Sequence, residues 1–230
     1  MTIALIDADI LTYRIGFSTE DEPEAIALVR MDNYIEEILR GSQASEYELF
    51  LTGRNNFRAK LYPAYKANRR GVPKPKHLQA LRQHLIDVED AVVSEGEEAD
   101  DLLGINQTYE TIICSIDKDL LMIPGRHYNF VKQQHSTVTE AEGRYNFYQQ
   151  LLTGDTTDNI PGIYGIGPKK AADLLRGCST EEEYNAVILR AYQQEFPHCS
   201  DEKVVAHINI IGRLLWIRRK ENEVWKFEMD

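Results

Sequence analysis

The 230-residue sequence contains only three cysteines, two tryptophans and no long hydrophobic run. The scarce cysteines include no C-x-x-C pair, which argues against a disulfide framework, and one conceivable zinc set has irregular spacing (Cys178, His198, Cys199 and His207, with Cys114 apart). No stretch reaches the roughly 18 apolar residues of a membrane span. The first residues lack the basic region and cleavage site of a secretory signal. We therefore expect a cytoplasmic protein with reduced thiols and no membrane contact.

The acidic and basic residues are distributed unevenly along the chain. The formal net charge is −11, with 37 acids and 26 basic residues, and 43% of the residues are hydrophobic. No acid occurs between Glu48 and Asp87, whereas the same stretch carries nine basic residues: Arg54, Arg58, Lys60, Lys66, Arg69, Arg70, Lys74, Lys76 and Arg82. A polyanion responds to the local field, which decays over about 8 Å in physiological salt. The overall acidity therefore does not exclude a nucleic acid as partner.

Hydrophobic periodicity predicts alternating strands and helices in the first part of the chain. The apolar run Ile3–Ile6 ends at Asp7 and has the pattern of a buried strand. Further strands are predicted at 47–52, 91–93 and 111–116, a hairpin at 128–131 and 136–139, and helices at 24–40, 77–88 and 99–107. This alternation predicts an α/β fold with a mostly parallel central sheet flanked by helices.

After residue 139 the pattern becomes helical. Helices are predicted at 140–152, 171–176, 182–195 and 202–218. We expect a catalytic α/β domain over residues 1–139, with the basic segment 54–82 inside it, and a helical subdomain over residues 140–230.

Four acidic segments fall at or just beyond predicted strand ends, or before a glycine-rich stretch. The carboxyl ends of parallel strands share one edge of a sheet, where ligands bind. Carboxylates gathered there repel one another unless cations are present, and oxygen-only ligation selects Mg²⁺ or Mn²⁺. The expected ligands are Asp7, Glu98, Asp100, Asp101, Asp117, Asp119, Asp155 and Asp158. Acids at a helix start also favour the positive end of the helix dipole, which is an alternative explanation for Glu97, Glu98 and Asp100. Asp9 is expected beside the site.

The glycine-rich stretch 159–172 is similar to a helix–hairpin–helix that binds a phosphate. Gly165 and Gly167 allow a tight turn, and the amides of the following helix start can face a phosphate, with Lys169 and Lys170 adding positive charge. No Gly-Lys-Ser/Thr follows, so the stretch is not a P-loop. The alternative is an ordinary glycine-rich turn.

The order of the motifs resembles that of the flap endonuclease/5′→3′ exonuclease superfamily, which includes the 5′-nuclease domain of bacterial DNA polymerase I and compact phage enzymes. The resemblance covers roughly residues 3–176 and rests on five elements: Asp7 after its strand, and residues 65–69, 98–101, 117–119 and 154–162. It implies a PIN-like (Rossmann-like) fold. It also implies Mg²⁺-dependent hydrolysis of DNA at 5′ ends or branched 5′ flaps, with 5′-phosphate products.

The resemblance also implies roles for individual residues. Two Mg²⁺ ions, with Mn²⁺ as an alternative, would be held by the eight carboxylates: the first by Asp7, Glu98, Asp100 and Asp101, with Asp117 shared, and the second by Asp119, Asp155 and Asp158. Lys66 and Arg69 would act with Asp117 near the scissile phosphate. Tyr65 would stack on a terminal base.

For DNA binding, the resemblance implies two surfaces. The basic segment would form an arch or clamp over a free 5′ end through Arg54, Arg58, Lys60, Lys66, Arg69, Arg70, Lys74 and Lys76. The helix–hairpin–helix, with Gly165, Gly167, Lys169 and Lys170, would hold duplex DNA and bind K⁺. The expected partners are DNA with a 5′ end, nick or flap and an RNA–DNA hybrid. We expect a monomer, located in the host cytoplasm if a phage encodes it.

Two departures from the family pattern and two rival functions stay open. Residues 50–56 contain no carboxylate where many relatives place an aspartate, so one metal would be held more weakly or through water and Thr52. The interval from Lys66 to Glu98 is short for a closed arch. The rivals are a PIN-type nuclease directed at RNA and a catalytically silent module that binds branched DNA.

Overall fold

The structure is a computed structural model that describes residues 2–228, and its chain forms two compact units. The first unit comprises the chain up to Asn56, Gly71–Thr139 and Ile217–Glu221. The second comprises Phe57–Arg70, Glu140–Trp216 and the residues from Asn222 on. The expected division into 1–139 and 140–230 assigns residues 57–70 and 217–221 differently, because sequence order alone does not show which unit a connecting segment packs on.

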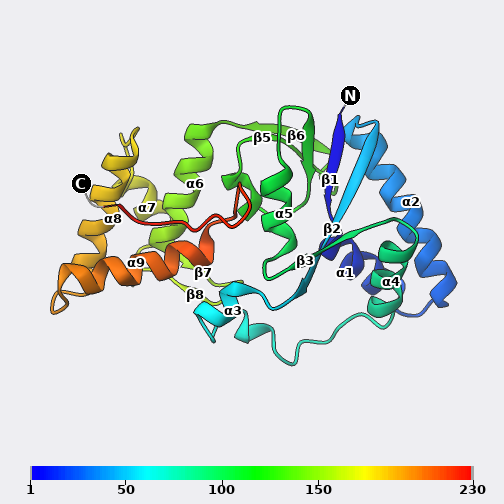
Figure 1. The fold of residues 1–230 in the computed structure, drawn as a ribbon, viewed down its shortest axis with the longest axis horizontal. Helices are drawn as coiled ribbons and strands as arrows, with labels where there is room; N and C mark the ends of the chain where they lie inside the picture. The colour runs from blue at the N-terminus through cyan, green and yellow to red at the C-terminus, as the bar shows by residue number, and fades with distance from the viewer. Residues whose placement is uncertain (1, 229–230) are drawn as a thin grey trace. The chain divides into compact units, whose positions relative to one another are not determined.

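The first unit is built on a six-stranded sheet in the order β3-β2-β1-β4-β5-β6 (Figure 1). β1 to β5 all run parallel to one another. β6 runs antiparallel to β5, as expected for the predicted hairpin. The bounds are β1 (Ile3–Asp7), β2 (Glu46–Arg54), β3 (Val92–Glu95), β4 (Thr111–Cys114), β5 (Gly125–Asn129) and β6 (Gln134–Val138). The predicted α/β fold with a mostly parallel sheet is confirmed.

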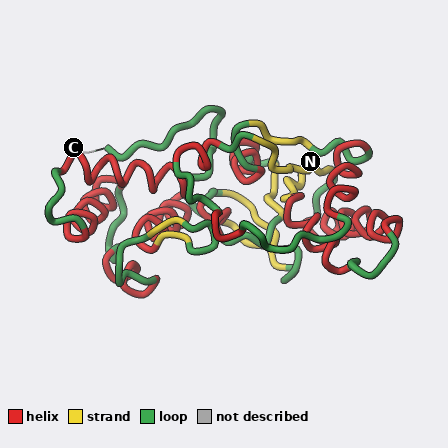
Figure 2. The backbone as a smooth tube through the Cα atoms, turned by 90° about the horizontal axis from the view of Figure 1, so that it is seen from below, coloured by secondary structure: helices red, strands yellow, loops and turns green. Residues whose placement is uncertain are grey.

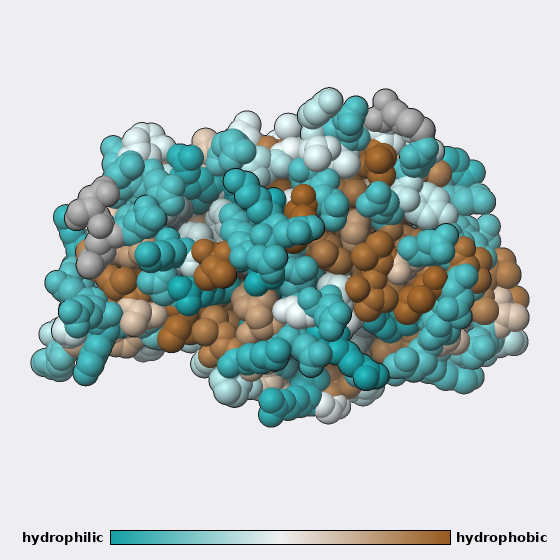
Figure 3. All heavy atoms as spheres, in the orientation of Figure 1, coloured by the Kyte–Doolittle hydropathy of each residue, from teal (hydrophilic) through white to brown (hydrophobic). Residues whose placement is uncertain are grey.

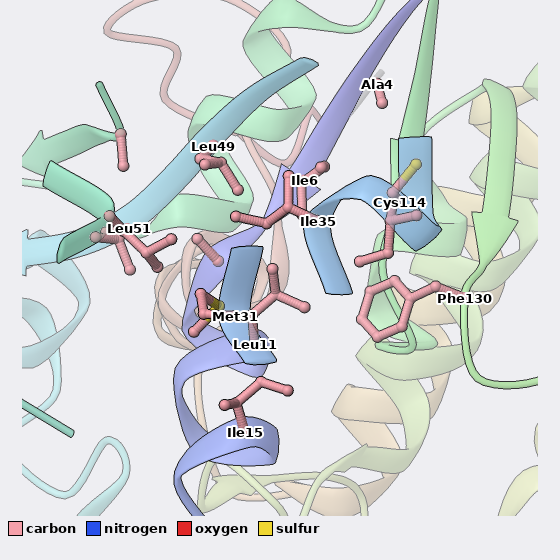
Figure 4. Packing of buried hydrophobic residues seen from close by; sticks show 14 of the residues in the cluster. Ala4, Ile6, Leu11, Ile15, Met31, Ile35, Leu49, Leu51, Cys114 and Phe130 are labelled. Atoms are coloured by element: carbon pink, nitrogen blue, oxygen red, sulfur yellow. The ribbon is translucent and has the colours of Figure 1, made fainter. Parts of the chain in front are cut away.

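Helices cover both faces of this sheet. Three of them form the larger layer: α1 (Ala8–Ser18), α2 (Glu24–Ser42) and α4 (Leu78–Asp87). Side chains alternate along a strand, so Ala4 and Ile6 point into this layer, where they pack with Leu11, Met31 and Ile35 (Figure 4). α5 (Ala99–Asn106) packs on β1 and β2 from the other side (Figure 1). The core therefore fixes β1 in the middle of the sheet, with Asp7 at its carboxyl end.

Helix α1 was not predicted from the sequence. Its buried residues have helical spacing, but two of these positions hold Thr12 and Gly16 rather than a large apolar residue. The apolar face of the helix is therefore hard to recognise in the sequence. Gly16 is required there, because a Cβ would lie 2.5 Å from Cβ of Pro75. Asp7 begins the helix by accepting a hydrogen bond from the amide of Ile10.

The second unit is mainly helical. Its elements are α3 (Phe57–Leu61), η1 (Ala67–Arg69), α6 (Glu140–Thr153), β7 (Gly154–Asp155), β8 (Ile160–Pro161), α7 (Pro168–Leu174), α8 (Glu181–Glu195) and α9 (Asp201–Leu215). Figure 2 shows the short β7–β8 pair, in yellow, among these helices. Phe147 of α6 packs edge-on against Trp216 and Trp225, and Gly212 of α9 leaves room for the Trp225 ring. These aromatic contacts join α6, α9 and the C-terminal segment.

The surface is consistent with the charged composition. On the face drawn in Figure 3, hydrophilic residues cover most of the surface, and hydrophobic residues form separate patches. Within residues 2–228, no helix is both long and apolar enough to cross a membrane. All three cysteines are free thiols.

Candidate functional site

Asp7 lies at the carboxyl end of the central strand and is buried, with 3% of its surface exposed. One oxygen accepts the amide of Ile10 at 3.3 Å, and the other accepts the hydroxyl of Ser115 at 2.9 Å. Burial, reinforced by the charges of Asp9 and Asp117, raises the pKa of Asp7 to about 7. A carboxylate in this position favours a nearby cation.

The segment after β4 holds two more of the expected ligands, Asp117 and Asp119, and the charge of Asp117 is close enough to affect Asp7. Besides donating to Asp7, the Ser115 hydroxyl accepts the amide of Asp117 at 3.0 Å. A carboxylate oxygen of Asp117 accepts the amide of Asp119 at 2.8 Å, and Asp119 begins the short helix η2 (Asp119–Met122). Ser115, which the sequence did not single out, therefore links the ends of β1 and β4.

The acids at the start of α5 also serve the helix itself. Glu98 and Asp101 form a capping box, in which Asp101 accepts the amide of Glu98 at 3.0 Å. The second oxygen of Asp101 accepts the amide of Arg218 at 3.1 Å, and the Arg218 guanidinium pairs with Glu97 at 2.8 Å. Glu98 and Asp101 thus stabilise the start of α5, although a carboxylate has further lone pairs for a metal. A role at the helix start was expected for Glu98 but not for Asp101. Asp100 lies in the same first turn.

The remaining two expected ligands belong to the second unit. Asp155, at the end of β7, is buried, and its carboxylate accepts the amide of Thr157 at 2.9 Å. Asp158 receives three donors from the predicted basic motif: the hydroxyl of Tyr65 at 2.9 Å, the ammonium of Lys66 at 3.4 Å and the guanidinium of Arg69. The expected ligand Asp158 and the expected phosphate-binding side chains are therefore bound to one another in this structure.

The backbones of the same two segments are also joined. The amide of Lys66, a residue with φ of 52°, donates to the carbonyl of Asp158 at 2.8 Å. The side chain of Asn159 donates to the carbonyl of Ala64 at 2.7 Å, and that of Asn68 to the carbonyl of Thr156 at 3.0 Å. Residues 64–69 and residues 155–159 are thus held together by hydrogen bonds between the two segments. Tyr65 is only 7% exposed, so stacking on a base would require its ring to become exposed.

The basic segment divides into exposed and buried members. Six of the expected DNA-binding residues in this segment are exposed: Arg54, Lys60, Arg69, Arg70, Lys74 and Lys76. Arg58 is instead buried at 2%, stacks on Phe57, and donates to the carbonyls of Leu214 at 2.9 Å and Trp216 at 2.7 Å. The guanidinium of Arg58 therefore satisfies the carboxyl end of α9 and lies away from the surface where DNA would bind.

The glycine-rich turn before α7 presents polar and aromatic groups to solvent. Gly165 has φ of 70°, which favours glycine, and Gly167 is the N-cap of α7. Lys169 and Lys170 are exposed in the first turn of α7, and Tyr164 is 90% exposed. These features match the expected phosphate-binding turn, while the helix–hairpin–helix itself stays a prediction.

One group of potential metal ligands was missed by the sequence analysis. Among the described residues, Asp32 of α2, His84 of α4 and Glu89 offer ligand atoms within 4.8 Å of one another. His84 contacts Asp32 at 2.5 Å, and the Tyr47 hydroxyl donates to Glu89 at 2.5 Å. Asp32 is far in the sequence from His84 and Glu89, and none of the three follows a strand end, so no sequence motif indicated the group.

Comparison with known proteins identifies the family. The family described as "5′-3′ exonuclease, N-terminal resolvase-like domain" matches residues 2–149. The chain belongs to this family. The flap endonuclease Xni of Shewanella sp. (strain ANA-3) is 32% identical over 195 residues, which cover 76% of this chain and 75% of the relative. DNA polymerase I of Borreliella burgdorferi is 35% identical over 144 residues, covering 54% of this chain and 16% of the polymerase. These relatives support the 5′-nuclease superfamily and nuclease action on DNA.

Solved structures share the fold. T5 5′-exonuclease with bound zinc has a TM-score of 0.61 at 19% identity and covers 94% of this chain and 86% of its own. The bacteriophage T5 D15 flap endonuclease, in a pseudo-enzyme–product complex with DNA and metal ions, has a TM-score of 0.58 at 14% identity and covers 92% and 99%. The phage-type architecture expected from the motifs is therefore the observed one.

Proposed function

We propose that this chain is a Mg²⁺-dependent 5′-nuclease that hydrolyses DNA at 5′ ends or branched 5′ flaps and leaves 5′-phosphates. The observation that carries the proposal is the buried carboxylate of Asp7 at the end of the central strand, with Asp9 and Asp117 close enough to raise its pKa. Membership of the 5′–3′ exonuclease family supports the DNA substrate. The similarity to Xni flap endonucleases supports action on flaps.

The donor set of the first unit fits a hard divalent cation. The donors are carboxylates, and the amide and the hydroxyl that donate hydrogen bonds to Asp7 carry no positive charge. The residues that would hold two Mg²⁺, or Mn²⁺, are Asp7, Glu98, Asp100, Asp101, Asp117, Asp119, Asp155 and Asp158. Such ions lower the pKa of a bound water and stabilise charge on both oxygens of an in-line phosphoryl displacement. That Asp155 and Asp158 complete the set is inferred from the order of the motifs.

The basic side chains of residues 65–69 would bind the scissile phosphate. Lys66 and Arg69 already bind the carboxylate of Asp158, whose two oxygens resemble those of a phosphate in charge and spacing. A DNA phosphate would compete for the same donors, and their positive charge would balance the charge that develops on the phosphate oxygens. Tyr65 would hold Asp158 in place through its hydroxyl hydrogen bond.

DNA further from the cut would be held by two exposed surfaces. Arg54, Lys60, Arg70, Lys74 and Lys76 would attract the backbone near the free 5′ end. The turn with Gly165 and Gly167, followed by Lys169 and Lys170, would bind a duplex phosphate, and its carbonyls would bind K⁺. Both surfaces would contact the DNA backbone rather than the bases. We therefore expect the structure of the DNA, and not its base sequence, to determine where it is cleaved.

The test is cleavage of end-labelled DNA carrying a 5′ flap, a nick or a single strand, in Mg²⁺ and in EDTA. We expect cleavage in Mg²⁺ only, with products that a 5′-phosphate-dependent ligase accepts. Asp117→Asn should abolish turnover while DNA affinity in Ca²⁺ changes little, and Lys66→Ala should lower kcat by about 10²-fold or more. Cleavage that resists EDTA, or full activity in Asp117→Asn, would refute the assignment.

The same assay separates the two rival functions. A PIN-type nuclease directed at RNA would cut the RNA versions of these substrates faster than the DNA versions. A silent binding module would retain branched DNA without any product after long incubation. The turn before α7, in which Tyr164 is exposed, and the family match favour DNA cleavage over both.

A further inference from the structure

Arg82 of α4 joins two segments of the first unit that are far apart in sequence. One nitrogen of its guanidinium donates to a carboxylate oxygen of Asp9 at 2.6 Å, and the other donates to the carbonyl of Thr52 at 2.7 Å. The side chains of Arg82 and Asp9 are 23% and 27% exposed, so solvent screens this ion pair only in part. Arginine suits this place because its planar fork can serve two acceptors at once.

The same ion pair also binds the backbone amide of Thr52. The second oxygen of Asp9 accepts the amide of Thr52 at 2.8 Å, so Asp9 and Arg82 together bind both the amide and the carbonyl of this residue. The Thr52 hydroxyl in turn accepts the amide of Ala99 at 2.9 Å. A continuous chain of hydrogen bonds therefore runs from α4 through Asp9 and the end of β2 to the first residue of α5.

Two members of this chain, Asp9 and Ala99, lie close in sequence to expected metal ligands. Ala99 lies between Glu98 and Asp100, so the hydroxyl of Thr52 fixes the point at which the acids of α5 begin. Asp9 follows Asp7 by two residues, and its charge is close enough to affect Asp7. Residues 50–56 contain no carboxylate, so the end of β2 contributes backbone groups and the Thr52 hydroxyl to this network.

We propose that Arg82 and Asp9 are positioning residues, which hold Thr52 and the start of α5 so that the acids of α5 lie at the distance from Asp7 that a divalent ion requires. This inference rests on the proposed nuclease function. Both carboxylate oxygens of Asp9 are used in the network, one of them by a guanidinium that balances its charge. Asp9 therefore acts through Thr52.

The test compares Arg82→Ala, Arg82→Lys and Asp9→Asn with the unaltered chain. Partners that orient metal ligands typically contribute 10–100-fold to metal affinity. For Arg82→Ala and Asp9→Asn we expect a rise of about 10-fold or more in the Mg²⁺ concentration that half-saturates cleavage, and an equal loss of Mn²⁺ affinity by calorimetry without DNA. Arg82→Lys keeps the charge and one donor, so it should restore part of the loss. The double variant should be no worse than the worse single one.

His84→Gln is the matched control, because His84 lies on the same helix and joins α4 to α2 through Asp32. It should lower the melting temperature without changing the Mg²⁺ requirement. A Mg²⁺ requirement and Mn²⁺ affinity in Arg82→Ala equal to those of the unaltered chain would overturn the inference. If the unaltered chain binds Mn²⁺ but cuts no substrate, the nuclease proposal fails, while the Mn²⁺ affinities still decide this inference.

Discussion

Asp7 combines three properties that conflict in the metal-free protein. It is buried, it is negatively charged when ionised, and two other acids stand near it. Its position at the end of an apolar strand was readable from the sequence, because Ile3–Ile6 is a continuous apolar run that a polar residue ends. The contact of Asp7 with Ser115 could not be predicted from the sequence. The two residues are 108 positions apart, and only the pairing of their strands brings them together.

Asp7→Asn should stabilise the metal-free protein at high pH. Because the pKa is raised from 3.8 in the unfolded chain to about 7 in the fold, stability is lost as pH rises through this interval. In EDTA at pH 8 the free energy of unfolding of the variant should therefore exceed that of the unaltered chain by on the order of 4 kcal/mol, and the difference should vanish near pH 4. Thermal melting from pH 4 to 8 measures this.

Asp90→Asn is the control for this change, because Asp90 is an exposed acid of the same unit. Added Mg²⁺ should stabilise the unaltered chain and Asp90→Asn, but not Asp7→Asn. An Asp7→Asn variant that is less stable at pH 8 and unaffected by pH would contradict the described state of Asp7.

At the scale of elements, most strands and helices were predictable, and the failures have physical causes. β2, α2, α4 and α6 have clear apolar spacing. Helix α1 was hidden by its small and polar buried residues. The short helix α3 was also missed, and with it the role of Arg58, because an arginine in a basic stretch resembles its exposed neighbours in sequence. Only the packing of α3 against α9 distinguishes it.

Arg58→Met should destabilise the protein without weakening DNA binding directly. The substitution leaves the carbonyls of Leu214 and Trp216 without their guanidinium donor, and a lost hydrogen bond to a charged group costs about 1.5–3 kcal/mol. Urea unfolding should show a loss of about 3 kcal/mol or more. The exposed Arg54→Met should leave stability within about 0.5 kcal/mol. Reduced DNA affinity of Arg58→Met with unchanged stability would contradict this prediction and indicate that Arg58 binds DNA.

The turn before α7 yields a prediction about salt. If Lys169 and Lys170 contact phosphates, Lys169→Ala/Lys170→Ala should weaken binding of every duplex similarly. It should also reduce the slope of log affinity against log salt by about 2, since each contact contributes about 1. Lys203→Ala/Lys226→Ala makes the same charge change at two other exposed positions and should leave the slope unchanged. Equal slopes for the two double variants would exclude this turn from the DNA surface.

Across the whole molecule, acidic and basic residues are segregated into different segments of the chain. A chain of net charge −11 keeps nine basic residues in an acid-free stretch and gathers acids at strand ends. The motif order was enough to predict the family and the α/β fold, whereas the set of metal ligands stays a prediction. The sequence did not reveal the network of Arg82, Asp9 and Thr52, nor the pairing of Lys66 and Arg69 with Asp158, because both depend on which side chains the fold brings together.

The most direct test of the central claim is anomalous diffraction at the manganese edge from crystals of the protein soaked in Mn²⁺. The account predicts Mn²⁺ within about 2.5 Å of carboxylate oxygens of Asp7 and Asp117, the distance expected for oxygen ligands. Manganese bound only elsewhere, such as at Asp32, His84 and Glu89, would contradict it.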